Sequence, residues 1–200
     1  SSFSANPNWP YDWSEFVTLN TGLVAHYPFD GNASDVSGNG NHGTVNGATL
    51  GADRHGVAGK AYGFDGVDDY ISSDQNLSMI GNDPRTMTTW WKPNSIPNKI
   101  LGILSTGSGS GTENGGFEIL GYHKPLAHWF GVGNVTGNGV LTLNKWHFLT
   151  ATYDQSNVHL YLDGNLVSSK AASLSTGLNK LFIGKPQVLE HGYAHGSIDD

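Results

Sequence analysis

The chain contains no cysteine among its 200 residues. No disulfide can therefore support the fold, and no thiol can serve as a nucleophile, a zinc ligand or a redox centre. The sequence also lacks a run of about 18 apolar residues, the length that a transmembrane helix needs. Its first residues lack the basic and then apolar profile of a signal peptide, but Ser1 is not an initiator methionine, so this says nothing for the cytoplasm.

Basic residues are also few. Ten Lys and Arg stand against 17 Asp and Glu, which gives a formal net charge of -7. Because such a surface repels polyanions on average, we expect no nucleic-acid partner. We also expect no membrane insertion.

Good helix formers are sparse, whereas 28 glycines and many Asn, Ser and Thr residues supply turns. Apolar and polar residues alternate in WHFLTATYD and NVHLYLDGNLVSS, and Asp163-Gly164 marks a turn between strands. AYGFDGVDDYI is interpreted as a hairpin about Asp65-Gly66, and GLVAHYPF as the first strand. About a dozen short strands of this kind predict an all-β fold, a two-sheet antiparallel sandwich or jelly roll.

The chain divides into two parts. Residues 1–21 hold two prolines and scattered aromatic residues, which favours a leader or linker, and residues 22–200 form one domain. Within the domain, residues 30–47 (DGNASDVSGNGNHGTVNG) have the composition of a long loop. Loops of that length usually need a tether or a function.

Six segments carry a resemblance to a known family. They are GLVAHYPFDGNASDVSGNGNHGTVNGA, AYGFDGVDDYI, TMTTWWKP, NKWHFLTATYDQSNVHLYLDGNLV, LFIGK and GSIDD. In this order they resemble bacterial laminin G-like, concanavalin A-like jelly-roll domains, which are related to pentraxins. The resemblance implies a secreted or cell-surface location. Family members usually continue beyond the Ile-Asp-Asp element, so we expect the last strand to be truncated and a strand edge to be exposed.

The resemblance also implies a structural calcium ion between the loop after the first strand and the acidic pair near the end. Carried over to this sequence, it nominates Asp30, Asn32, Asn41 and Asp199 as ligands. Carbonyls near His42 and Thr44 are additional candidates, and Asp35 is a reserve. Calcium takes six to eight oxygen ligands, which such a loop can supply. The alternative is that Asp30 and Asn32 only form side-chain turns.

The function that the resemblance implies is carbohydrate binding, as a lectin-like module of a larger protein. Sugar recognition needs an aromatic face and polar groups that fix hydroxyls. Trp90 and Trp91 must point to opposite faces of their strand. The predicted ligand-binding residues are Trp91, Tyr122, His123, Trp129, Glu190, His191 and Tyr193. For the tryptophans the alternative is burial in the core, and for the loop residues a solvated rim.

Two other functions stay open at this stage. One is a protein-binding or structural domain of an adhesin, with a cell-surface or matrix protein as partner. The other is a polysaccharide lyase or hydrolase. Glycosidases on this fold need two carboxylates spaced like E-x-D-x-x-E, and the sequence has no such element. Gly107-Ser108-Gly109 lies in a glycine tract without the strand-to-helix context of a nucleophile elbow. We therefore expect no catalytic residues.

Overall fold

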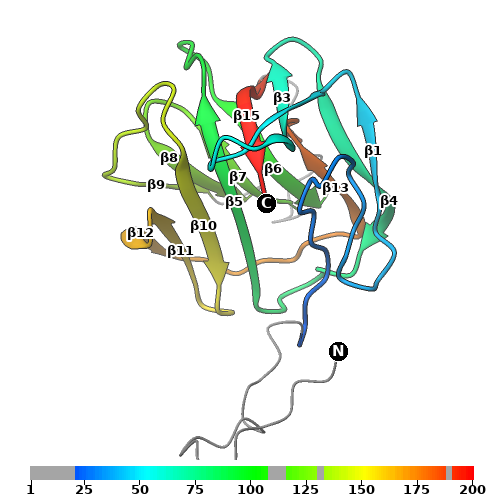
Figure 1. The fold of residues 1–200 in the computed structure, drawn as a ribbon. Coiled ribbons are helices and arrows are strands. Elements are labelled where there is room, and N and C mark those ends of the chain that lie inside the picture. Colours follow the sequence, from blue (N-terminus) through cyan, green and yellow to red (C-terminus); the bar gives the residue numbers. More distant parts are fainter. Residues whose placement is uncertain (1–20, 108–115, 130–132, 188–190) are drawn as a thin grey trace, which may run out of the picture.

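The structure is a computed structural model that describes residues 21–107, 116–129, 133–187 and 191–200. These residues form two sheets that stack face to face (Figure 1), and the described part of the chain contains no helix. The prediction of an all-β, two-sheet sandwich is confirmed.

The first sheet follows the order β1-β4-β13-β6-β7-β8-β9, and its neighbours in this order are antiparallel. A short strand, β14 (Gly192–Tyr193), pairs in parallel with β6. The other strands of this sheet are β1 (Gly43–Asn46), β4 (Tyr70–Leu77), β6 (Leu101–Gly107), β7 (Gly116–Gly121), β8 (Pro125–Trp129), β9 (Gly133–Thr136) and β13 (Asn179–Ile183).

The second sheet follows the order β12-β11-β10-β5-β15-β3-β2 and is antiparallel. Its strands are β2 (Thr49–Ala52), β3 (Ala58–Asp65), β5 (Arg85–Pro93), β10 (His147–Tyr153), β11 (Asn157–Leu162), β12 (Asn165–Ala171) and β15 (His195–Asp199). Burial alternates along β10 and β11 with a period of two. Every second side chain of these strands therefore enters the core.

Of the two hairpins predicted from Asp-Gly turns, the structure contains one. Asp163 and Gly164 both have positive φ angles, 50° and 81°, and join β11 to β12 as the sequence predicts. The predicted hairpin about Asp65-Gly66 is wrong, because β3 and β4 belong to different sheets. The chain crosses the sandwich there, and each strand buries its inward face from its own side. The predicted first strand is wrong, because residues 22–29 form no strand.

The strands β6 and β7 are buried on both faces. The inward face packs in the core, and the loop after β13 lies against the outward face. Ser105 Oγ donates a hydrogen bond to the Lys185 carbonyl at 2.7 Å, and the Gln187 backbone N–H donates to Glu118 at 2.6 Å. A Cβ on Gly102 would lie 2.2 Å from the Pro186 nitrogen, so only glycine permits this close approach.

The strand β5 has an open edge in the described part of the chain. β15 pairs Ile198 with Trp91 and Asp199 with Trp90, and beyond this point Arg85–Thr89 pair only with β10. A cavity of about 660 Å³ lies beside this edge. Its apolar lining includes Leu77, Met87, Leu104, Leu181, Ile183 and Ile198.

Trp91 is the largest fully buried side chain of the core. We expect Trp91→Ala to lower the free energy of unfolding by about 3–5 kcal/mol, because it leaves a large cavity. Urea unfolding followed by circular dichroism would measure this loss. Leu178→Ala is the control: Leu178 is 61% exposed, so a change within about 0.5 kcal/mol is expected. Equal losses for the two variants would contradict the burial of Trp91.

Candidate functional site

A group of aromatic side chains and one lysine lies on the outward side of the first sheet. Tyr70 of β4 lies 6.1 Å from Phe182 of β13 and 6.4 Å from Tyr193 of β14, measured between ring centroids. The Lys185 ammonium lies 4.5 Å from the ring centroid of Tyr70 and 5.0 Å from that of Phe182. We call these four residues the aromatic surface.

Strand alternation explains why these rings face outward. Ile71 pairs with Ile183, and both are buried in the core. Their neighbours Tyr70 and Phe182 therefore point to the other side of the sheet. Gly184 follows at a φ of 83° and turns the chain, which brings Lys185 over the two rings.

The aromatic surface has the chemistry that sugar recognition requires. All four side chains are partly exposed, so the rings offer apolar area at the surface. A pyranose or furanose ring can stack its C–H face on such a platform. The Lys185 ammonium is held by the rings and has N–H donors for hydroxyl or carboxylate oxygens.

Three carboxylates lie close together in the connection between β3 and β4, just before Tyr70. Asp65, Asp68 and Asp69 each place an oxygen within 4.8 Å of the others, the only such trio of acidic or histidine side chains in the described residues. Asp69 accepts the Asp65 backbone N–H at 2.9 Å. Burial, followed by repulsion from Asp65 and Asp68, raises the pKa of Asp69. The trio adds hydrogen-bond acceptors next to Tyr70 in the sequence.

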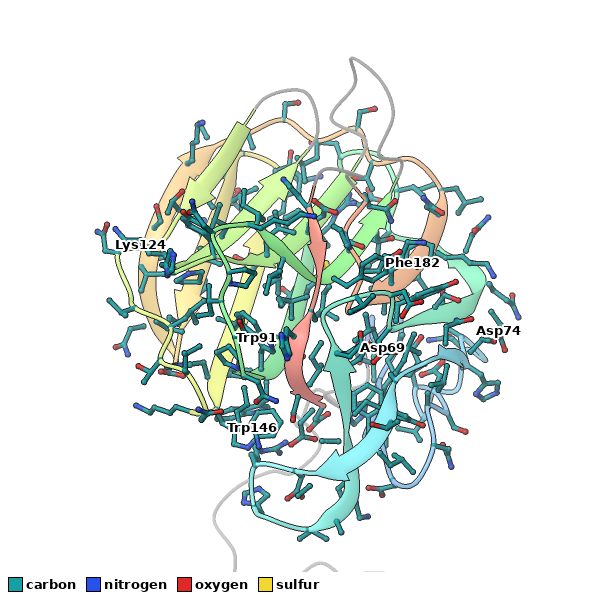
Figure 2. The ribbon with its side chains drawn as sticks, turned by 90° about the horizontal axis from the view of Figure 1, so that it is seen from above. Asp69, Asp74, Trp91, Lys124, Trp146 and Phe182 are labelled. Carbon is teal, nitrogen blue, oxygen red and sulfur yellow. The ribbon has the colours of Figure 1, made fainter. Side chains whose placement is uncertain are left out.

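The predicted ligand-binding residues do not converge on one site. Trp91 is fully buried, with its ring against Gly121, so its nomination as a surface residue is corrected, and its neighbour Trp90 is the one that faces outward. Figure 2 shows Trp91 near the centre of the molecule and places Lys124 on the side away from Phe182. The loop of Tyr122 and His123, next to Lys124, is therefore separate from the aromatic surface.

The remaining predicted ligand residues have different outcomes. Tyr193 belongs to the aromatic surface, and His191 is partly buried just before it. Tyr122 donates a hydrogen bond to Asn98 Oδ1 at 2.5 Å, and its ring contacts that of His123. Glu190 and the side chain of Trp129 lie outside the described part of the structure. The sequence reading missed Tyr70, Phe182 and Lys185, although strand alternation would have placed the two rings outward.

The predicted calcium ligands are each engaged by other partners. Asp30 pairs with the Lys60 ammonium at 2.7 Å, and Asp199 pairs with Arg54 at 2.6 Å. Asn32 Oδ1 accepts the Ser34 backbone N–H, which is a side-chain turn. Asn41 Nδ2 donates to the Val24 carbonyl. Calcium at these four residues stays a prediction from the sequence.

Asp35 holds the loop of residues 30–47 in place through hydrogen bonds. Its carboxylate accepts the backbone N–H groups of His26, Ser37 and Asn41 at 2.9–3.0 Å. Burial alone would raise the pKa of Asp35, but these hydrogen bonds outweigh it and lower the pKa. Tyr27 also donates a hydrogen bond to the Asn41 carbonyl at 2.5 Å. The loop is therefore tethered by protein groups.

Comparison with protein families identifies the chain. The family model of the concanavalin A-like lectin/glucanases superfamily matches residues 65–200. The chain belongs to this superfamily, and the predicted resemblance is confirmed. A search of curated protein sequences finds no match.

Solved structures show the same fold at low sequence identity. Domain 4 of AbnA, a GH43 extracellular arabinanase from Geobacillus stearothermophilus solved with arabinotriose, has a TM-score of 0.65 and 21% identity, covering 88% of this chain and 89% of that one. Trypanosoma rangeli sialidase in complex with sialic acid has a TM-score of 0.60 and 13% identity, and the match covers 88% of this chain and 29% of that one. Mouse laminin α1 domains LG4-5 have a TM-score of 0.51 and 20% identity, and the match covers 70% of this chain and 39% of that one. None of the described segments forms a helix that could cross a membrane.

The raised pKa of Asp69 predicts how the stability of the fold depends on pH. A carboxyl group whose pKa is higher in the folded state than in the unfolded state disfavours folding once it is ionised. Asp69→Asn, which mimics the neutral form, should therefore be more stable than the natural protein at pH 7. The difference should shrink as the pH falls through the folded pKa and vanish below the unfolded value of 3.8.

Urea unfolding of both proteins between pH 3 and pH 7 would measure the effect. Carboxyl NMR titration gives the pKa of Asp69 directly, and Asp68→Asn should bring it closer to 3.8 because one repelling charge is removed. A pKa of Asp69 below 3.8 in the folded protein would contradict the prediction.

Proposed function

We propose that this domain is an extracellular carbohydrate-binding module of a larger protein, and that it binds its glycan on the aromatic surface. The observation that carries the proposal is the cluster of Tyr70, Phe182 and Tyr193, with the Lys185 ammonium over the first two rings. Aromatic rings grouped on a sheet face, with a cation fixed among them, can stack a sugar ring and hydrogen-bond its polar substituents. The domain binds the glycan without converting it.

The comparisons support this function in general terms. The domain of the arabinanase was solved with arabinotriose, and the sialidase with sialic acid. Both chains share this fold at low identity, so the likeness supports glycan recognition as a class and does not select a sugar. The superfamily includes lectins and glucanases by its own description.

A second location is favoured by a specific observation. Trp90 and Phe148 lie 5.1 Å apart on the outward face of the second sheet, and both are partly exposed. A cation covers part of the rings at both locations, Arg54 over Trp90 here and Lys185 over Tyr70 and Phe182 on the aromatic surface, so the number of rings decides between them. The aromatic surface, with three rings from three strands, is the stronger candidate.

A second function is a protein-binding or structural role in a surface adhesin. The shared fold with laminin α1 domains is compatible with it. This candidate would be favoured if the domain bound no glycan.

A glycan array, run with calcium and with chelator, tests the proposal. Tyr70→Ala and Tyr193→Ala should each weaken binding of any glycan that the natural domain binds by about tenfold or more, equivalent to about 1.4 kcal/mol, because each removes part of the stacking surface. Phe148→Ala on the other sheet is the control and should bind normally. Binding lost only in Phe148→Ala would move the site to the second sheet.

Two further outcomes concern the class of protein. Calcium-dependent binding would support a calcium site in the domain. Turnover of a bound polysaccharide by the isolated domain would contradict a purely binding role.

A further inference from the structure

The cation of the aromatic surface has no carboxylate partner among the described residues. The Lys185 ammonium lies 4.5 Å from the ring centroid of Tyr70 and 5.0 Å from that of Phe182. The ion pairs of the described residues are formed by other cations, namely His26, Arg54, Lys60, His147 and His159. No described acidic side chain therefore neutralises the charge of Lys185.

The acidic residue that adjoins this lysine has its carboxylate engaged elsewhere. A Cβ on Gly184 would lie 3.3 Å from the carbonyl oxygen of Asp69, so Asp69 reaches the residue just before Lys185. The Asp69 carboxylate accepts the Asp65 backbone N–H at 2.9 Å and lies against Gly47. The fold thus brings an acidic residue close to the lysine without pairing the two charges.

Hydrogen bonds fix the backbone that carries Lys185. Ser105 Oγ donates to the Lys185 carbonyl at 2.7 Å. The Gly184 N–H donates to the Ile103 carbonyl, and the Gly184 carbonyl accepts the Ala194 N–H, both at 2.8 Å. Attraction to the faces of the two aromatic rings holds the ammonium itself. A cation positioned in this way costs less ordering when a ligand binds.

The third ring of the aromatic surface is the one on which a sugar can stack. Tyr193 is not one of the two rings that the ammonium contacts, and its centroid lies 6.4 Å from that of Tyr70. A sugar on Tyr193 would therefore have the ammonium beside it, over the neighbouring ring. In uronic and sialic acids the carboxylate is bonded to a ring carbon and extends from the edge of the ring. An ammonium binds a carboxylate about twice as strongly as neutral groups hydrogen-bond each other.

Negative charge around the surface limits how many carboxylates the ligand can carry. Asp65 and Asp68 are exposed and Asp69 is partly buried in the connection that leads to Tyr70, and the whole chain has a net charge of -7. Ionised carboxylates only accept hydrogen bonds, so they suit sugar hydroxyls and repel further anions. A single carboxylate among neutral sugars fits this surface better than a densely charged polymer.

We propose that the aromatic surface selects glycans that carry an isolated carboxylate, as a uronic acid or a sialic acid unit among neutral sugars. The ring of the acidic sugar stacks on Tyr193, and its carboxylate binds the Lys185 ammonium. This inference rests on the proposed function, because it names the class of glycan that binds at the same surface.

The test compares acidic oligosaccharides with their carboxyl-reduced forms, in which a neutral primary alcohol replaces the carboxylate. One pair is built on a xylo-oligosaccharide with a single glucuronic acid, and the other on lactose capped with sialic acid. Isothermal titration calorimetry should show that the natural domain binds the acidic member of at least one pair about tenfold or more tightly than the reduced member. The two pairs distinguish uronic from sialic acid.

Three variants assign the preference to one side chain. Lys185→Met keeps a long side chain on the rings without the charge, so its affinity for the acidic member should fall to that for the reduced member. Lys185→Arg keeps the charge and should keep the preference. Lys180→Met is the control, since Lys180 belongs to the same strand but is not one of the cations over the two rings. It should bind like the natural domain. If Lys185→Met does not fold, Lys185→Gln serves.

Several results would overturn this inference and leave the proposed function standing. They are equal binding of the two members of both pairs, binding of neutral glycans only, and tighter binding of polygalacturonate than of the singly acidic oligosaccharides. A preference that survives in Lys185→Met, or that Lys180→Met removes, would also overturn it, because the carboxylate would then bind another group. If the natural domain binds no glycan, acidic or neutral, the proposed function itself fails.

Discussion

Burial of the two inward sheet faces against each other is the interaction on which the rest of the structure depends. Trp91 lies fully buried between the sheets, and its ring meets Gly121 of β7 so closely that a Cβ there would lie 2.3 Å from it. Because strand side chains alternate, each residue buried inside commits its neighbours to the outside. The outward positions of Tyr70, Phe182 and Trp90 follow from the inward positions of Ile71, Ile183 and Trp91.

The few basic residues of this acidic chain have defined positions. Arg85 is buried and donates hydrogen bonds to the carbonyls of Met79, Ile80, Gly81 and Asp83, which closes the turn before β5. Lys185 lies over aromatic rings and Arg54 over the Trp90 ring and two carboxylates. One cation therefore stabilises a turn, one belongs to a candidate binding surface, and one pairs with a buried carboxylate, that of Asp199.

The errors of the sequence reading have a common physical origin. The turn chemistry of Asp65-Gly66 is real, since Gly66 has a φ of 82°, but the strands on either side enter different sheets. Local dihedral preferences specify a turn and not the partner of each strand. Likewise, alternation along β5 placed Trp90 and Trp91 on opposite faces but not which of them enters the core, and the structure buries Trp91, the one nominated for the surface.

The sequence alone determined the all-β class, most of the strands and the superfamily, because these depend on local periodicity and on motifs in a fixed order. Only the tertiary structure decided which of two adjacent tryptophans is buried, which rings gather around Lys185, and that Arg54 meets Asp199 from 145 residues away. These are contacts between distant segments. They depend on sheet order and register, which are set by the packing of the whole core and leave no local pattern in the chain.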